Sequence, residues 1–103
     1  MTLARVQFAD DALSDLDKLV QFLLQQDDPS ALELLDFIQD GLGVLNHQPG
    51  IGRPLPGGLR ELILNRGSKS GYLVKCRYLP HIAAVRVLRI RHQRQSGYTD
   101  KEI

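Results

Sequence analysis

The sequence predicts an α+β fold of the order βααβββ, in which a two-helix hairpin packs on one face of a small, mostly antiparallel sheet. Two segments between residues 11 and 45 carry apolar residues at helical spacing, and three strand-like runs occupy residues 59–92. A further alternating run precedes the helices. Because no internal repeat or low-complexity tract interrupts the sequence, we expect residues 1–103 to form one domain.

The first strand and the first helix follow each other closely. Residues 3–9, LARVQFA, alternate around Val6 and Phe8 and predict a strand. Asp10 and Asp11 come next, and aspartate is a typical helix-capping residue. Apolar residues then recur at steps of three and four, which predicts an amphipathic helix up to residue 26. These apolar positions are Leu13, Leu16, Val20 and Leu23.

The second helix is predicted to begin at Asp28 and Pro29. Aspartate caps the free N–H groups of a first turn, and proline at the first helical position has no N–H to leave unbonded. Its apolar stripe consists of Ala31, Leu34, Leu35, Ile38, Leu42 and Leu45. Gly41 and Gly43 weaken the last turns by about 1 kcal/mol each relative to alanine. We therefore expect another backbone to approach closely there.

Residues 46–58, NHQPGIGRPLPGG, form a loop by composition because they are rich in proline and glycine. Three strand-like runs follow, at residues 59–65, 71–79 and 83–92. The middle run alternates between an apolar side and a partly basic side. In the last run the apolar residues fall on both parities, which indicates burial on both faces or a β-bulge.

The charges divide the chain into two halves. Residues 1–52 contain two cationic and nine acidic residues, whereas residues 53–103 contain eleven cationic and three acidic ones. This split predicts two surfaces of opposite sign. The basic half would bind phosphate or an acidic partner.

Composition also excludes several classes of protein. Cys76 has no second cysteine to bond, and we expect it to fill space in a strand; the three scattered histidines form no zinc pattern. We expect no metal and no cofactor. The N-terminus lacks the features of a signal peptide, and no run approaches the ~18 apolar residues of a membrane span. We expect a cytoplasmic protein with no membrane partner.

Cations gather at the end of the last strand. Residues 85–98 read VRVLRIRHQRQSGY, and four of these fourteen residues are arginines. Arginine is costly to hold near a core. These side chains therefore either extend outward as solubilising charge or converge on an anion.

The order of these segments resembles the RelE/ParE superfamily of toxins from bacterial type II toxin–antitoxin (plasmid stabilisation) modules. The resemblance rests on the loop PGIGRPL after the second helix, the strand GYLVKCRY, and the final strand VRVLRIRHQR. It implies a toxin that is made with a cognate antitoxin and arrests growth when free of it. ParE-like members bind and poison DNA gyrase, whereas RelE-like members are metal-independent endoribonucleases that cut messenger RNA on the ribosome.

The resemblance to the ribonucleases also suggests site residues. Arg66, Arg77 and Arg94 would bind the phosphate in the transition state, His92 would act as an acid, and Tyr98 would stack on a base. A partner would be bound by Arg53, Arg60, Arg89, Arg91 and Tyr98. Structural alternatives stand beside these roles: Arg77 would pair with Glu61 on a neighbouring strand, His92 would be a hydrogen-bonded surface residue, and Tyr98 would have no role.

One departure from the ribonuclease pattern favours a ParE-like toxin. RelE-like nucleases take a general base from lysines or a glutamate in the region before the second strand of the fold, and the corresponding residues 46–61 contain no lysine here. Only His47 and Glu61 remain for that role. A missing base removes a step worth ~10²–10⁴-fold in rate. The sequence leaves enzymatic activity undecided, and a small RNA-binding domain outside the family is a third interpretation.

Overall fold

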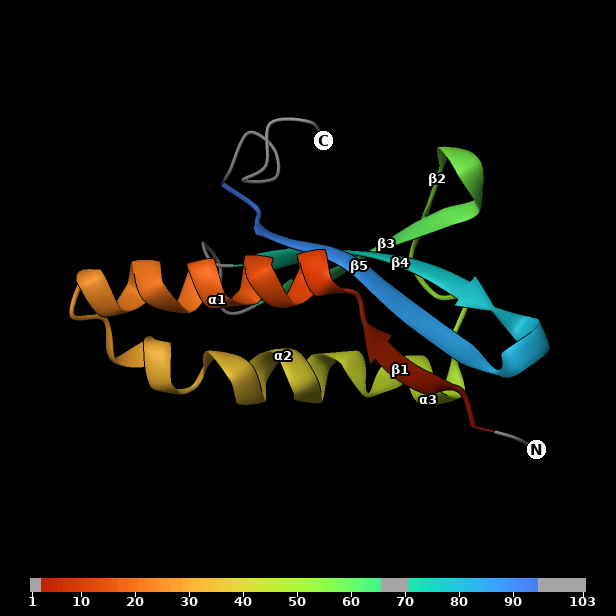
Figure 1. Ribbon diagram of the computed structural model, residues 1–103, viewed down its shortest axis with the longest axis horizontal. Helices are drawn as coiled ribbons and strands as arrows, with labels where there is room; N and C mark the ends of the chain where they lie inside the picture. Colours follow the sequence, from red (N-terminus) through yellow and green to blue (C-terminus); the bar gives the residue numbers. More distant parts are fainter. Residues whose placement is uncertain (1–2, 66–70, 95–103) are drawn as a thin grey trace.

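A computed structural model describes residues 3–65 and 71–94 of the chain. The regular elements in these residues are β1 (Arg5–Phe8), α1 (Asp10–Gln25), α2 (Leu34–Leu42), α3 (Val44–His47), β2 (Arg53–Leu55), β3 (Leu59–Asn65), β4 (Gly71–Leu79) and β5 (Ala84–His92). The five strands form one sheet in the order β1-β5-β4-β3-β2, in which β1 is parallel to β5 and the other pairs are antiparallel. The antiparallel helices α1 and α2 lie side by side against this sheet (Figure 1). The predicted α+β fold class is confirmed.

The core lies between the helices and one face of the sheet. From the helices, Leu34, Ile38, Leu42 and Leu45 are fully buried, as the predicted apolar stripe of the second helix requires. Leu35 was predicted in the same stripe and is half exposed, so that part of the prediction is wrong. From the sheet, the buried residues include Tyr72, Val74, Val87 and Ile90. Burying apolar side chains of this size contributes about 1.5–3 kcal/mol each. The apolar side chains of the helices and those of the alternating strands therefore pack together in one layer.

The predicted second helix is divided into three pieces. A 3₁₀ turn at Pro29–Leu32 precedes α2, and α3 follows after Gly43. Asp28 caps the 3₁₀ turn as predicted, because the Ser30 N–H donates to Asp28 Oδ1 at 2.9 Å. The first helix differs: its N-cap residue is Ala9, and no side chain caps it.

Gly41 approaches a side chain and not a backbone, so that part of the prediction is wrong. A Cβ added to Gly41 would lie 2.8 Å from Leu64 Cδ2 on β3. A Cβ on Gly43 would meet only backbone oxygens of the preceding helical turn, Asp40 O at 3.2 Å and Gln39 O at 4.0 Å. The absence of a side chain at Gly41 therefore lets α2 pack closely on β3.

The predicted loop before the three strands contains the short strand β2. It pairs with the start of β3 in the register Arg53↔Glu61. Pro54 is tolerated because β2 forms the edge of the sheet and leaves one side of its backbone unpaired. Composition alone indicated a loop, since proline and glycine are rare inside strands.

The irregular alternation of the last strand comes from a β-bulge, which was one of the two predicted explanations. Lys75 is opposite Arg89 and Cys76 is opposite Val87, so Leu88 has no partner of its own on β4. The extra residue restores the apolar alternation after the bulge. Val87 and Ile90 consequently both face the helices.

No helix in the described part of the chain is long and apolar enough to cross a membrane.

Candidate functional site: the open face of the sheet

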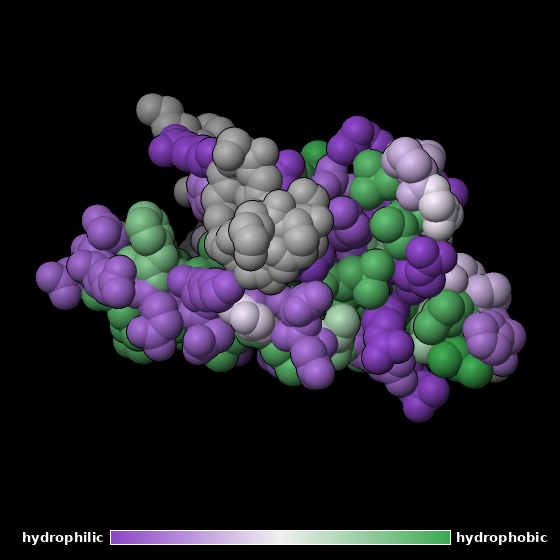
Figure 2. Space-filling model, turned by 45° about the horizontal axis from the view of Figure 1, so that its top comes forward, coloured by the Kyte–Doolittle hydropathy of each residue, from purple (hydrophilic) through white to green (hydrophobic). Residues whose placement is uncertain are grey.

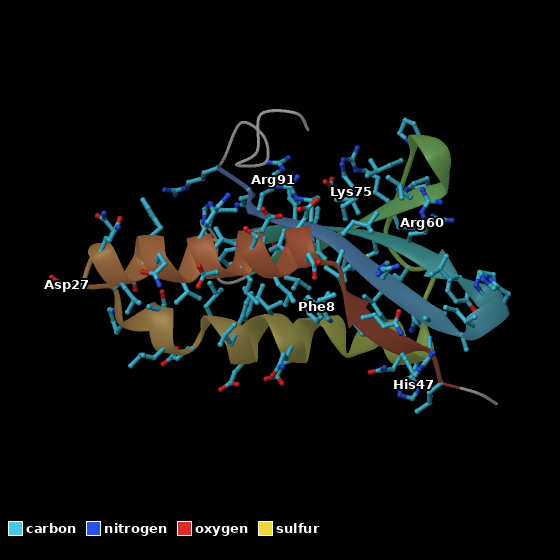
Figure 3. The ribbon with its side chains drawn as sticks, in the orientation of Figure 1. Phe8, Asp27, His47, Arg60, Lys75 and Arg91 are labelled. Atoms are coloured by element: carbon cyan, nitrogen blue, oxygen red, sulfur yellow. The ribbon has the colours of Figure 1, made fainter. Side chains whose placement is uncertain are left out.

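The open face of the sheet is the face opposite the helices. Register and alternation place these side chains on it: Arg5 and Gln7 from β1, Arg53 from β2, Glu61 and Ile63 from β3, Leu73, Lys75, Arg77 and Leu79 from β4, and Arg86 and Arg91 from β5. Lys75 and Arg91 point to the same side of the sheet (Figure 3). Because Glu61 is the only acid among these residues, the open face is strongly basic, while the other nine acidic residues that the structure describes lie between residues 10 and 40, in α1, α2 and the segment that joins them.

Three of the predicted partner-binding arginines, Arg53, Arg60 and Arg89, have hydrogen-bond partners inside the chain, and the first two lie beside the loop before β3. Arg53 donates from Nη2 to Oε1 of Glu61, whose side chain is only 7% exposed. Arg60 donates from Nη1 to the Gly52 carbonyl oxygen at 3.1 Å. These contacts hold the loop before β3 against that strand. Arg53 and Arg60 therefore have a structural role besides the predicted binding role.

Arg89 is buried and bonds to α1. Its Nε and Nη2 atoms donate to the two oxygens of Asp15 at 2.7 and 2.8 Å, and both side chains are at most 5% exposed. Asp15 also accepts the backbone N–H of Ile90 at 2.9 Å. Since β1 pairs only with the first part of β5, Asp15 supplies the acceptor that a neighbouring strand would otherwise provide. Arg89 thus holds α1 to the open edge of β5.

His92 lies on the helix side of the sheet. It is the register partner of Tyr72, and the two rings pack edge to face with centroids 5.2 Å apart. The backbone N–H of Arg94 donates to His92 Nδ1 at 3.1 Å. Burial, and then the charge of Arg94, lower the pKa of His92 below its ordinary value of 6.5. The imidazole is therefore mostly neutral at neutral pH, with Nδ1 occupied as an acceptor.

We expect Arg94→Gln to raise the pKa of His92, because the substitution removes the repulsion between the guanidinium and the imidazolium. NMR titration of the His92 ring would measure the shift. Arg86→Gln is the matched control, since it removes the same charge from the far part of β5 and should leave the His92 titration in place. An equal response to both variants would mean that net charge, and not the neighbouring Arg94, lowers this pKa.

The lowered pKa of His92 also fixes the sign of a pH effect on stability. The unfolded chain binds the proton near pH 6.5, before the folded chain does. Stability that is present above pH 6.5 is therefore lost as the pH falls from there through the folded-state pKa of His92.

The structure does not bring Arg77 and His92 together. Arg77 is opposite Arg86, and His92 is opposite Tyr72. These two positions are five residue steps apart along β4, which is about 17 Å along a strand. The two side chains also point to opposite faces. Arg66 and Tyr98 lie outside the described residues.

The alternative prediction that Arg77 pairs with Glu61 is wrong. The register partner of Glu61 is Lys75, and its carboxylate is bonded to Arg53. Sequence analysis missed Arg53 as the partner because β2 could not be recognised. It also left out Arg5 and Arg86 as site residues, although both are exposed on the same face as Arg77.

Cys76 and the acidic residues offer no metal or nucleophilic site in the described ranges. Cys76 is 2% exposed, and burial raises the pKa of its thiol to about 12. Its thiolate is therefore scarce at neutral pH. Within residues 3–65 and 71–94, no three histidine, cysteine, aspartate or glutamate side chains gather as metal ligands would.

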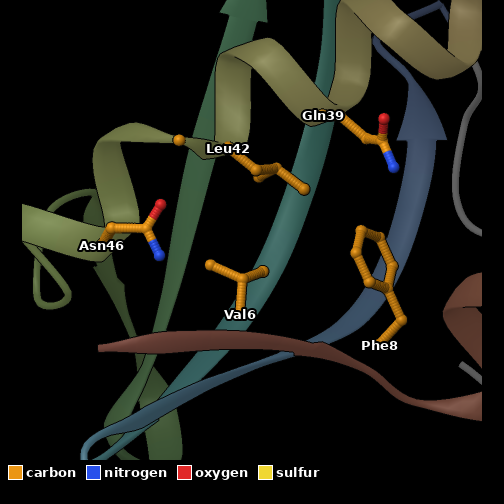
Figure 4. Close-up of a pocket in the computed structure, with 6 residues that line it drawn as sticks. Val6, Phe8, Gln39, Leu42 and Asn46 are labelled. Carbon is orange, nitrogen blue, oxygen red and sulfur yellow. The ribbon is translucent and has the colours of Figure 1, made fainter. Parts of the chain in front are cut away.

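A pocket of about 290 Å³ lies in the other layer of the molecule, between β1 and the helices. Val6 and Phe8 project into it from β1, and Leu42, Gln39 and Asn46 face them (Figure 4). It contains none of the predicted site residues and no ionisable side chain. This pocket therefore does not compete with the open face as the candidate site.

Comparison with solved structures identifies the fold. The chain is similar to the chromosomal ParDE toxin–antitoxin system from P. aeruginosa, with a TM-score of 0.68 and 24% identity over 85% of this chain and 94% of that one. It is also similar to a mutant of the E. coli toxin RelE in the free state (TM-score 0.58, 18% identity, 87% and 82% covered). A third similar structure is the RelBE2 complex from Mycobacterium tuberculosis (0.56, 24%, 88% and 99%). The fold is that of RelE/ParE toxins.

The family follows from the sequence match. The family model described as the ParE toxin of the type II toxin–antitoxin system, parDE, matches residues 6–97. The chain belongs to this family of toxins, which confirms the predicted superfamily. A search of curated proteins gave no match.

Proposed function

We propose that this toxin acts in the ParE manner: freed from its antitoxin, it binds DNA gyrase, poisons it and performs no chemical step itself. The observation that carries the proposal is the separation of Arg77 from His92 along β4 and on opposite faces of the sheet. A ribonuclease must place its phosphate-binding and proton-transferring groups around one phosphate. The match to the ParE family model supports the same target class.

The positions of Glu61 and His47, the two remaining candidates for a general base, support the proposal as well. Glu61 is buried and bonded to Arg53. His47 lies on α3, at the far side of the molecule from Arg91 and the end of β5 (Figure 3). Neither is near His92, whose Nδ1 already accepts a hydrogen bond from Arg94. The described residues therefore assemble no acid–base pair around an anion.

The antitoxin is proposed to cover the helical hairpin with an amphipathic segment. Phe22, Leu24 and Leu35 are about half exposed on α1 and α2, and Leu32 between them is 84% exposed. Apolar side chains reach the surface among hydrophilic ones at this end of the hairpin, at the left of Figure 2. Exposed apolar groups of this kind mark protein-binding surfaces. The toxin and the antitoxin would meet in the cytoplasm, where gyrase works.

A purified system tests the proposal directly. We expect the toxin to inhibit the supercoiling of plasmid DNA by purified gyrase with no ribosome present, and to induce a DNA-damage reporter in cells while messenger RNA stays intact. His92→Gln should retain this growth arrest, because His92 has no catalytic task under the proposal. Messenger RNA cut at codon positions, with the cuts lost in His92→Gln, would instead establish the ribonuclease.

A further inference from the structure

The strand register places three arginines at one end of the open face, and we call them the arginine trio: Arg5, Arg77 and Arg86. Arg77 on β4 is directly opposite Arg86 on β5. Arg86 is in turn the register partner of Gln7 on β1, and Arg5 is two residues before Gln7 on the same face. All three arginines are exposed, although they come from three different strands.

The arginine trio has no acidic counterpart within the described residues. The side chains that share this end of the face are Gln7, Leu79 and Ala84. Glu61, the one acid on the open face, is bonded to Arg53. Elsewhere in the sheet, Arg89 is neutralised by Asp15. Among the described residues, the buried Arg89 is thus balanced by an acid, whereas the exposed charges of the arginine trio are not.

This arrangement is unfavourable for the free protein. Like charges directly opposite each other on neighbouring strands repel. A guanidinium also presents a planar fork of donors that matches the oxygens of a phosphate or a carboxylate. An anion bound between Arg77 and Arg86 would remove the repulsion and use both forks.

We propose that the arginine trio binds phosphate groups of a nucleic-acid backbone, independently of base sequence. At Arg86 the backbone of β5 is paired with β1 on one side and β4 on the other, so an extended peptide cannot add to the sheet there. Nucleic-acid backbones are held by side-chain contacts to phosphates and need no strand pairing. This proposal stands whether or not gyrase is the target, since it concerns the toxin alone.

The salt dependence of binding tests the arginine trio. We would measure the anisotropy of a labelled DNA duplex of about 20 base pairs against the folded toxin over a series of KCl concentrations. Each contacted phosphate contributes about −0.9 to the slope of log K against log salt. We expect Arg5→Gln, Arg77→Gln and Arg86→Gln each to lower the affinity and to reduce the magnitude of the slope by about one.

Lys18→Gln is the matched control, because it removes one exposed cation from α1 in the other layer. It should leave the slope unchanged. Thermal unfolding of Arg77→Gln and Arg86→Gln should show no loss of stability, since each removes one of two repelling charges. This second readout separates a lost binding group from a damaged fold.

Three results would contradict the proposal. The first is a toxin that does not bind the duplex at low salt. The second is an equal loss of slope in Lys18→Gln and in the trio variants, which would mean that net charge alone attracts DNA. The third is a trio-dependent affinity for polyglutamate with none for DNA, which would assign the trio to an acidic protein segment.

Discussion

Replacing Asp15 with alanine is expected to lower the free energy of unfolding by about 3–5 kcal/mol. The substitution leaves the guanidinium of Arg89 buried at 4% exposure without the carboxylate that neutralises it. It also removes the acceptor of the Ile90 N–H at the edge of β5. A small domain has only ~5–15 kcal/mol of stability, so this loss is a large fraction of the total.

Urea unfolding followed by circular dichroism would measure this effect as a shift of the midpoint. Asp17→Ala is the control, because Asp17 is an exposed carboxylate on the same helix and should change stability by no more than about 0.5 kcal/mol. A loss below about 1 kcal/mol in Asp15→Ala would mean that water reaches Arg89 and replaces the carboxylate.

A double substitution separates the effect of the buried charge from the effect of the lost hydrogen bond to the Ile90 N–H. Asp15→Leu combined with Arg89→Met removes both charges and keeps apolar volume, so we expect it to recover most of the lost stability. The unbonded Ile90 N–H would remain and should cost about 1–3 kcal/mol. A double variant no more stable than Asp15→Ala would assign the whole effect to that one N–H group.

The sequence predicts the local elements of this fold and not the contacts between distant ones. Asp28 and Pro29 predict the start of the 3₁₀ turn because a capping side chain bonds to a backbone N–H no more than three residues away. The Asp15–Arg89 pair joins residues 74 positions apart, and no local pattern marks it. The parallel pairing of β1 with β5 is hidden for the same reason, although it places Arg5 on the same face of the sheet as Arg86.

In the candidate site, too, contacts between chain neighbours could be predicted and contacts that depend on strand register could not. His92 and Arg94 are neighbours in the chain, so sequence alone placed them together. The partner of Glu61 depended on strand register, and the three-residue strand β2 supplied Arg53 in place of Arg77. The predicted division of charge did carry over, because the acidic half forms the helices and most of the basic half forms the sheet.

Gly52→Ala is expected to cost at least about 2 kcal/mol, because two effects add at this position. The φ angle of Gly52 is +120°, which L-residues rarely adopt, and such strain costs about 1–3 kcal/mol. A Cβ there would also lie 3.0 Å from the carbonyl oxygen of Glu61, an atom of the sheet backbone. Relief of this contact would move the loop away from β3 and weaken the bonds of Arg53 and Arg60.

Two other glycines of the same loop separate strain from overlap. Gly57 has a φ of +81° but open space around it, so Gly57→Ala should show strain alone, about 1 kcal/mol. A Cβ on Gly50 meets no atom within 4 Å, and its backbone conformation suits any residue, so Gly50→Ala should be neutral or slightly stabilising. Urea midpoints should therefore fall in the order Gly50→Ala, Gly57→Ala, Gly52→Ala. If Gly52→Ala and Gly57→Ala had the same urea midpoint, the loop would accommodate the new methyl group without leaving β3. The overlap with Glu61 would then not contribute to the loss of stability.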